Sequence, residues 1–557
     1  MSTASELIRK DILAGLESAF EKGTLPEIQV DDAAIERPQN PEHGNFACSL
    51  PLKLAKPFKM NPLAIAKALT ENLPTNGVIG NASVVAPGFI NITLDRRWVL
   101  DQVHWIRDNP ETFSDISIGK GKSVQVEYVS ANPTGRLHIA HARGAVIGST
   151  LSELLRTAGY IVQEEYYLND AGNQIDNFDI SLLTRYRQLC GECVELPEGA
   201  YPGEDIIDVA RKILDRDGHR YLKMPEEEAR SAIGIAGTPL ILEGISQDIS
   251  SLRIQFDNWF SEKSLFKAGQ FQKCIKILND KGFVEKKDGA TWLISSELGE
   301  EKDNVLIRRT GAPTYFATDI AYHFNKFHER RFDRVIDIWG ADHQGQVSRL
   351  KSALAALGTN PDDLDMVIVQ MVRFKKGKTA EKLSKRSGNV IPLLELVNEV
   401  GADACRFMFL SRSHDSQLEF DLDLAKENSS ENPVYYVQYA HARICSILRL
   451  ATSKGISFDE GEPNRLGEPS ELNLINKMLE LPDVVETSVR NLEPHHLPHY
   501  ALELATCFHL FYQNCRVISS HASDIPLTKS RLMLVDAARI VLKKSLDLMK
   551  MTAPEKM

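Results

Sequence analysis

The sequence has no long apolar run and no secretion signal. No stretch of about 18 uninterrupted apolar residues occurs in the chain, which excludes an ordinary membrane-spanning helix. The N-terminal segment mixes acids with bases and places Ile8, Ile12 and Leu16 on one helical face. This pattern predicts a packed helix and not a signal peptide. We therefore expect a cytoplasmic protein without a membrane partner.

Cysteine is also scarce, with eight residues among 557. Only Cys190 and Cys193 are close in sequence, and two thiols are half of the four ligands that a structural zinc site needs. Reduced thiols and no bound metal are the simplest interpretation.

Positive charge is in deficit, since 65 Lys and Arg residues face 76 Asp and Glu residues and the net charge is −11. A protein of this charge does not bind nucleic acid with its whole surface, because phosphate contacts need local positive charge. Any nucleic-acid contact has to come from local basic patches.

The chain is long enough for three or four domains. Residues 1–113 combine helical patterns with the alternating run VVAPGFINITL, which predicts one strand of a small α/β domain. Residues 396–557 follow a helical pattern throughout and predict an α-helical bundle. The polar segment SDISIGKGKS marks a linker at the start of the middle part.

Residues 114–395 alternate between strand and helix patterns. VQVEYVS, YIVQEEYYL, RVIDIWG and MVIVQMV predict strands, and a helix pattern ends at Gly159. This α/β alternation predicts a doubly wound, Rossmann-type parallel sheet, whose ligands bind at the carboxyl ends of the strands. A helical insertion near 175–250 interrupts the alternation.

The segment from Asn132 to His141, NPTGRLHIAH, lies between the first predicted strand and a helix. The helix start directs free N–H groups at a bound phosphate, and His138 and His141 can donate to charge that develops there. Alone, two histidines three residues apart also suit a metal or simple packing.

A second motif, KLSKRSGN, contains Lys382, Ser384 and Lys385. Its lysines can neutralise a triphosphate and the pyrophosphate that leaves it, although most basic loops are simply solvated. H-x-x-H after the first strand together with K-x-S-K after the last resembles the paired signature of class I aminoacyl-tRNA synthetases.

Further motifs resemble the arginyl-tRNA synthetases of bacteria in the same order along the chain: PQNPEHGNFA, VEYVSANPTG, YLNDAGNQI, FDNWFSEKSL, PTYFATDIAYH, WGADHQGQ and NPVYYVQYAHARI. The resemblance implies an arginine–tRNA ligase that is a monomer. Its partners would be ATP with Mg2+, L-arginine and the arginine tRNA, with no tightly bound cofactor.

The resemblance also implies roles for individual residues. Catalysis falls to His138, His141, Lys382 and Lys385. The implied ATP site comprises Gly135, His138, Ala140, His141, Ser384 and Lys385. A guanidinium is best held by carboxylates in forked hydrogen bonds, and the implied arginine site comprises Glu127, Asn132, Glu262, Tyr315, Asp319 and Gln346.

Two positions depart from the family's motifs. Ala140 stands where the family has glycine, and Leu383 where methionine is commoner. Both replacements are small or conserve volume, so we expect activity to survive.

Two other groups have alternative interpretations. Tyr435, Tyr436 and Tyr439 suit core packing and contact with tRNA equally. The cluster of His495, His496 and His499 could suggest a metal, but a proline before it and an apolar helix after it favour a helix start with solvated imidazoles.

Two other function classes fit parts of the pattern. One is a nucleotidyl-transferring enzyme of the same fold, such as a synthetase for a different amino acid or a pantothenate-type ligase. A lysine or cysteine pocket would lack the pair Glu262 and Asp319. The other is a non-catalytic RNA-binding relative, which would have lost histidines or lysines of the two signatures.

Overall fold

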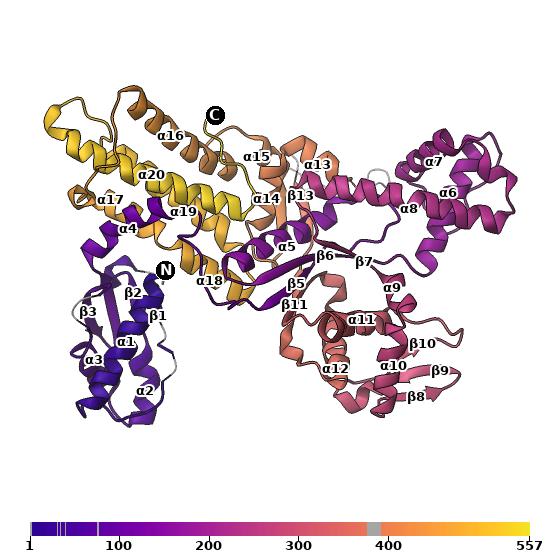
Figure 1. The fold of residues 1–557 in the computed structure, drawn as a ribbon, viewed down its shortest axis with the longest axis horizontal. Coiled ribbons are helices and arrows are strands. Elements are labelled where there is room, and N and C mark those ends of the chain that lie inside the picture. The colour runs from indigo at the N-terminus through magenta and orange to yellow at the C-terminus, as the bar shows by residue number, and fades with distance from the viewer. Residues whose placement is uncertain (1–2, 31, 34, 39, 75–76, 376–390) are drawn as a thin grey trace.

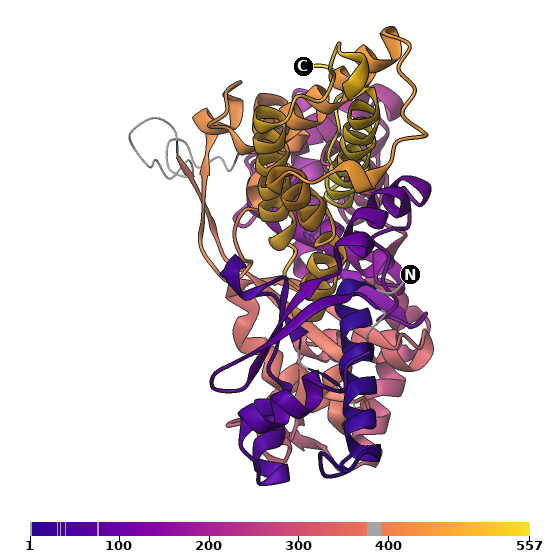
Figure 2. The same ribbon diagram turned by 90° about the vertical axis from the view of Figure 1, so that its left-hand side faces the viewer.

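The computed structural model describes residues 3–557 except 31, 34, 39, 75–76 and 376–390. The helical body that runs toward the C-terminus and the separate N-terminal domain lie on one side of the central sheet, and the helical insertion lies on the other (Figure 1). Viewed at right angles, the helical body lies above the N-terminal domain (Figure 2). Within the described part of the chain, no helix is both long and apolar enough to cross a membrane.

The N-terminal domain is an α/β unit, as predicted. Its first helix buries Ile8, Ile12 and Leu16 and begins with a capping box between Thr3 and Glu6. An antiparallel sheet of order β1-β2-β4-β3 packs against it. The elements are α1 (Ala4–Glu21), β1 (Ile35–Glu36), β2 (Phe46–Cys48), α2 (Leu50–Phe58), α3 (Pro62–Thr70), β3 (Ile79–Val85), β4 (Phe89–Leu94) and α4 (Arg96–Asp108).

The prediction of a single strand over VVAPGFINITL is wrong. Strands β3 and β4 form an antiparallel hairpin, with Val85 opposite Phe89. Pro87 lacks the N–H that a continuing strand needs, and Gly88 adopts a positive φ of 153°. The alternation of hydrophobic residues correctly indicates strand structure, but it does not reveal the turn at Pro87 and Gly88.

The predicted doubly wound parallel sheet is confirmed, with strand order β12-β11-β5-β6-β7. The chain runs outward from β5 to β7 and then returns to place β11 beside β5, so the topological switch point lies between β5 and β11. The strands are β5 (Ser123–Glu127), β6 (Ile161–Leu168), β7 (Asn258–Ser261), β11 (Arg334–Gly340) and β12 (Leu364–Val369).

Both faces of this sheet are covered, and successive residues of β11 point to opposite layers. Ile336 and Ile338 join the large core that includes helix α5 (Ile139–Thr157), whereas Val335 joins the core on the side of α10–α12. The elements on the latter side are α9 (Glu262–Lys267), α10 (Gln270–Asp280), β8 (Val284–Lys287), β9 (Ala290–Leu293), β10 (Asn304–Ile307), α11 (Tyr315–Phe324) and α12 (Val347–Leu357).

Three helices occupy the region where the helical insertion was predicted: α6 (Asn173–Leu189), α7 (Glu204–Asp217) and α8 (Glu226–Ser251). They form the lobe that extends away from the sheet in Figure 1. The boundaries assigned to the three domains from the sequence stay predictions.

The C-terminal part is helical with one exception that the sequence did not indicate. Strand β14 (Leu418–Asp421) pairs in parallel with β13 (Val372–Lys375). The helices are α13 (Leu393–Val400), α14 (Ala402–Leu410), α15 (Leu422–Lys426), α16 (Pro433–Ser453), α17 (Pro469–Met478), α18 (Leu481–Asn491), α19 (His496–Asn514) and α20 (Ile525–Leu548).

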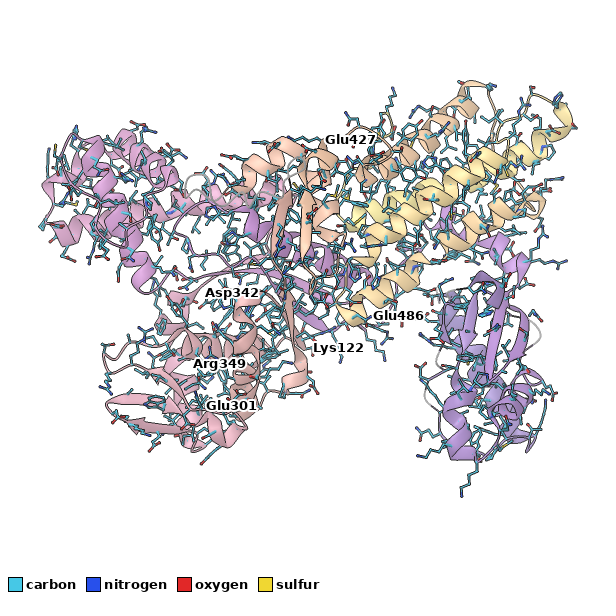
Figure 3. All side chains as sticks on the ribbon, turned by 180° about the vertical axis from the view of Figure 1, so that it is seen from behind. Lys122, Glu301, Asp342, Arg349, Glu427 and Glu486 are labelled. Carbon is cyan, nitrogen blue, oxygen red and sulfur yellow. The ribbon has the colours of Figure 1, made fainter. Side chains whose placement is uncertain are left out.

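Ion pairs connect the N-terminal domain to this helical body. The guanidinium of Arg37 donates to Asp483 Oδ2 from Nε at 3.0 Å and from Nη2 at 2.6 Å. Arg9 lies 3.5 Å from Glu486, which is labelled on α18 in Figure 3. A forked arginine–carboxylate pair fixes orientation as well as distance, so Arg37 sets how the domain docks.

Arg406 of α14 is fully buried and has no carboxylate among its hydrogen-bond partners. Its guanidinium donates to Leu252 O at 2.7 Å, to Met549 O, and to Ser149 Oγ at 3.1 Å. It therefore ties the end of the insertion and the C-terminal segment, bound through their carbonyls, to α5, bound through the Ser149 hydroxyl.

Replacing Arg406 by lysine should destabilise the protein by about 2–4 kcal/mol, because one ammonium cannot satisfy carbonyls that a planar guanidinium spans. Urea denaturation followed by circular dichroism measures the change. Arg465→Lys is the matched control, since Arg465 is half exposed and pairs only with nearby Glu462. Equal stability of the two variants would contradict the importance of the buried guanidinium.

Candidate active site

The polar motifs of the central sheet gather at the carboxyl ends of its strands. β5 leads into the first signature, β7 ends directly before Glu262, and β11 ends at Gly340 before the segment that contains Gln346. Because these strands are parallel, their carboxyl ends lie at one edge. The sheet therefore brings together motifs that are more than 200 residues apart.

The turn after β5 holds a backbone conformation that side chains rarely adopt. Val129 has a φ of 70° and Ser130 a φ of 42°. A β-branched residue in the left-handed region is strained. Ser130 compensates through its hydroxyl, which donates to Glu127 at 2.8 Å and accepts from Tyr167 N at 3.2 Å. The turn redirects the chain toward Asn132 and the signature.

His138 and His141 lie at the start of α5, with His138 as the N-cap residue. The backbone N–H of His138 donates to Nδ1 of His141 at 3.2 Å. This contact makes Nδ1 of His141 an acceptor and leaves its Nε2 to carry the proton. Burial, with a smaller contribution from His138, lowers the pKa of His141, so its imidazole is a neutral donor at pH 7. Nδ1 of His138 is buried and has no hydrogen-bond partner among the residues that the structure describes.

Two carboxylates from the insertion hold the signature turn. Asp205 of α7 accepts from the backbone N–H of Arg136 at 2.9 Å, and a Cβ at Gly135 would lie 2.7 Å from that carboxylate. Asp248 of α8, itself fully buried, accepts from Arg136 Nε at 2.8 Å and from the N–H of Leu137 at 3.0 Å. Glycine at 135 thus leaves room for the carboxylate of Asp205, and the insertion positions the turn before His138.

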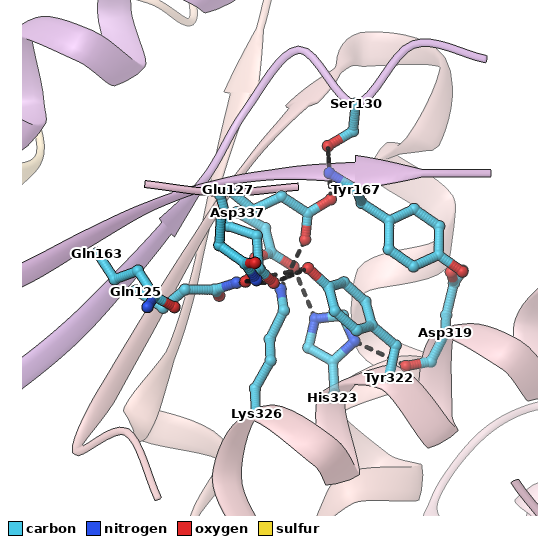
Figure 4. Close-up of polar contacts among 12 residues, drawn as sticks. Gln125, Glu127, Ser130, Gln163, Tyr167, Asp319, Tyr322, His323, Lys326 and Asp337 are labelled. Carbon is cyan, nitrogen blue, oxygen red and sulfur yellow. Dashed lines mark hydrogen bonds and ion pairs between the residues drawn. The ribbon is translucent and has the colours of Figure 1, made fainter. Parts of the chain in front are cut away.

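A buried ion network lies beneath this edge (Figure 4). Lys326, fully buried on a π-helical turn after α11, donates to Glu127 Oε2 at 2.6 Å and to Asp337 Oδ1 at 2.8 Å. His323 Nε2 lies 2.6 Å from the other oxygen of Asp337. Although burial opposes ionisation, Lys326 and His323 hold the pKa of Asp337 at about 2. Both oxygens of Glu127 are engaged, by Lys326 and Ser130.

Glu262 and Asp319 differ from these paired acids. Within the described residues no basic side chain forms an ion pair with either, and Glu262 is 5 % exposed. Burial, with the negative charge of Asp319 nearby, raises the pKa of Glu262 to about 7. Burial and the charges of Glu127 and Asp337 raise that of Asp319 to about 7 as well, although His323 opposes the shift. Two acids without a counter-ion form a site suited to a cation.

The other predicted ligands lie around the same edge. Asn132 donates to Gln174, and Gln346 lies 3.2 Å from Nδ1 of His343. Tyr315 is half exposed at the first turn of α11, the helix that carries Asp319. Ala140 is exposed on the first turn of α5, where its methyl group faces outward.

The second signature, with Lys382, Ser384 and Lys385, lies outside the described residues. The flanking residues are described. β13 ends at Lys375, and after the signature Ile391 O accepts from the N–H of Ile139 at 3.2 Å. The N–H of Leu393 donates to Leu137 O at 2.8 Å. The chain thus returns from the second signature directly onto the first.

The three tyrosines of α16, Tyr435, Tyr436 and Tyr439, differ in how far their rings are buried. Tyr436 is half buried against the core and lies 4.9 Å from the His509 ring. Tyr435 and Tyr439 stack in parallel with centroids 6.0 Å apart, and Tyr439 is 37 % exposed. Arg443 lies over Tyr439 at 5.7 Å. We call Tyr435, Tyr439 and Arg443 the aromatic patch.

The histidine cluster marks a helix start, as predicted, because His495 is the N-cap residue of α19. Its imidazoles are not all solvated, since Nδ1 of His495 is buried and no described residue forms a hydrogen bond with it. Among the described residues this is also the place where potential metal ligands meet: atoms of Glu493, His495 and His496 lie within 4.8 Å of one another. It belongs to the helical body and not to the strand edge.

Sequence reasoning missed several residues of the strand edge: Arg136, Asp205, Asp248, Lys326 and Asp337. An acid inside the apolar run RVIDIWG was a usable signal for Asp337, because a buried carboxylate needs a partner. Lys326, Asp205 and Asp248 are ordinary polar residues of helices, and only the tertiary contacts distinguish them.

Three known protein families match successive parts of the chain. Residues 6–94 match the family described as "Arginyl tRNA synthetase N terminal domain", and residues 108–415 match "tRNA synthetases class I (R), catalytic domain". Residues 437–557 match "DALR anticodon binding domain". An arginine–tRNA ligase of Dehalococcoides mccartyi is 50% identical over 551 residues, covering 99% of this chain and 98% of its own.

Two solved structures share the fold. One from Campylobacter jejuni, assigned as an arginyl-tRNA synthetase, superposes with a TM-score of 0.76 at 35% identity and covers 83% of this chain and 100% of its own. The arginyl-tRNA synthetase of Thermus thermophilus gives a TM-score of 0.75 at 22% identity, covering 99% of this chain and 100% of its own.

Glu262→Gln should stabilise the protein above pH 7. The folded-state pKa of Glu262 lies above its unfolded value of 4.5, so the wild-type chain loses stability as the pH rises through about 7. The variant should therefore melt several degrees higher at pH 8, and the difference should vanish by about pH 5, near the unfolded pKa. Calorimetry across this range checks it, with exposed Glu285→Gln as the control. A difference that is independent of pH would contradict the assignment.

Proposed function

The chain belongs to the arginyl-tRNA synthetase family and attaches arginine to its transfer RNA at the expense of ATP, and from this we propose which residues bind each substrate. The observation that carries the proposal is a pair of acids, buried Glu262 and half-buried Asp319, that have no basic ion-pair partner among the described residues. A guanidinium is a cation with donors on a planar fork, which suits two carboxylates better than any neutral side chain does.

Glu262 and Asp319 then hold the guanidinium, with the Tyr315 side chain beside them. Asn132 and Gln346 bind the α-amino end. We assign Glu127 to the same pocket as its inner wall, since its two oxygens are already engaged by Lys326 and Ser130. Neutral amino acids leave two acids unpaired, and lysine offers a single ammonium, so no separate editing site is needed.

ATP, with Mg2+ as part of this substrate, lies at the start of α5, next to Gly135, His138, Ala140 and His141. The arginine carboxylate attacks the α-phosphorus, which forms arginyl-adenylate and releases pyrophosphate. Nε2–H of His141 and the free nitrogen of His138 donate to charge on the α-phosphate. Lys382, Ser384 and Lys385 bind the phosphates that leave, and no protein nucleophile is required.

The terminal adenosine of the tRNA then attacks the adenylate through a ribose hydroxyl and releases AMP. Tyr435, Tyr436 and Tyr439 contact the tRNA in this proposal, and the exposed ring of Tyr439 with Arg443 over it is suited to stacking on a base. The enzyme acts in the cytoplasm as a monomer. Free thiols at all eight cysteines are consistent with a reducing compartment.

Glu262→Gln and Asp319→Asn should each raise the KM for arginine by about 100-fold or more, because each removes a charge-assisted pair from a buried site. The KM for ATP should stay within about two-fold. ATP–pyrophosphate exchange with a panel of amino acids, each with and without arginine tRNA, measures both constants. Exchange by the wild-type enzyme with another amino acid, or an unchanged arginine KM in both variants, would overturn the pocket.

Tyr439→Ala should raise the KM for tRNA about ten-fold, since stacking on one base contributes about 1–3 kcal/mol. Tyr436→Ala should instead lower the melting temperature, because its ring is half buried. Aminoacylation at varied tRNA concentration separates the two effects. Leu450→Ala, exposed farther along α16, is the control. An unchanged KM for tRNA in Tyr439→Ala would show that these tyrosines contribute only to packing.

A further inference from the structure

Arg143 is a second fully buried arginine, and it lies on α5 two residues after His141. It forms no ion pair within the described part of the chain, and all its hydrogen bonds go to backbone carbonyls. A buried cation that binds only carbonyls holds backbone segments in place.

The carbonyls belong to two segments. Nη1 donates to Gln370 O at 2.9 Å, directly after β12, and to Ser416 O at 2.7 Å, directly before β14. Nη2 donates to Ser413 O at 2.7 Å. The N–H of Gln370 also donates to His414 O at 2.9 Å, so the two segments are joined to each other. The guanidinium therefore fixes both to α5.

These segments form the base of the ladder between β13 and β14. The ladder pairs Val372 with Leu418 and ends with Lys375 opposite Asp421. Lys375 is the last described residue before the second signature, and Ile391 after it bonds to Ile139 of α5. Both flanks of the second signature are thus tied to the helix of the first, one through Arg143 and the other through the backbone.

We infer that Arg143 is a positioning residue for arginine activation, because it sets the base of the β13–β14 ladder relative to His138 and His141. This inference rests on the proposed roles of the signature lysines. Those lysines act when pyrophosphate leaves, whereas transfer of arginine from the adenylate to tRNA does not need them. Arg143 should therefore affect the first step and spare the second.

Arg143→Lys is the test, and Arg406→Lys is its matched control. Both arginines are fully buried and donate to carbonyls. Arg406 lies on α14 and binds the insertion, the C-terminal segment and two hydroxyls of α5, but no residue of the β13–β14 ladder. Assays run well below the melting temperature of the weaker variant. Arg143→Lys should slow ATP–pyrophosphate exchange about 10- to 100-fold, while transfer from chemically prepared arginyl-adenylate to tRNA stays within about two-fold. Arg406→Lys should leave both steps within two-fold.

The double variant Arg143→Lys, Lys385→Ala should catalyse ATP–pyrophosphate exchange no more slowly than Lys385→Ala alone. Both changes remove the same contribution, that of the signature lysines to the release of pyrophosphate. The inference would be overturned if Arg143→Lys slowed exchange and transfer equally, or if Arg406→Lys slowed exchange as much as Arg143→Lys does. A double variant whose loss of exchange rate is the product of the two single losses would also overturn it. Slow exchange by Lys385→Ala with normal exchange by Arg143→Lys would overturn the inference and keep the proposed function. Normal exchange by Lys385→Ala would overturn the proposed role of that lysine, and the inference with it.

Discussion

Two carboxylates lie directly opposite each other on neighbouring strands, and the ammonium of Lys326 between them neutralises their charge. This contact stabilises the centre of the fold. Asp337 on β11 is in register with Glu127 on β5 at the topological switch point, and both are buried. Like charges in this arrangement repel, so the sheet could not close there without a cation. Lys326 reaches the pair from a π-helical turn, and π-turns commonly occur where a functional geometry has been fitted into a helix. The strained turn at Val129, the Ser130 contact and the start of the signature are all built on this neutralised pair.

The fold was largely predictable because its signals are local. Strand runs such as RVIDIWG and the helix that ends at Gly159 follow from periodicity, and alternation of strand and helix implies a parallel sheet. Sequence reasoning failed where the local pattern of a segment was compatible with two structures. Pro87 and Gly88 split a single alternating run into a hairpin, and β14 is too short to separate from the surrounding helices. For the site, the motifs identified His138, His141, Glu262 and Asp319, of which Glu262 directly follows β7 and Asp319 lies on α11. They could not show that Glu127 is already neutralised, because its partner Lys326 comes from a distant helix whose local sequence carries no signal.

The helical insertion acquires a physical role from its two aspartates. Asp205 and Asp248 come from helices that are far from the sheet in sequence, yet both end on the backbone N–H groups just before His138. A backbone turn held by carboxylates from another lobe is rigid only while that lobe is docked. Arg143 likewise binds backbone carbonyls, those of the segments before β13 and β14. The signature helix is therefore held by charged side chains that bind backbone groups, and Asp248 in addition forms an ion pair with Arg136.

The acid pocket has a consequence for how the enzyme binds its amino acid. With pKa values of about 7, Glu262 and Asp319 hold protons for much of the time when no cation is present. On the proposed assignment, arginine has to displace those protons before both carboxylates can bind its guanidinium. The proton is then a competitor of arginine for one site, and each binding event releases acid to the solvent. Occupancy of the pocket therefore depends on the ratio of arginine to hydrogen ions, and not on the concentration of arginine alone.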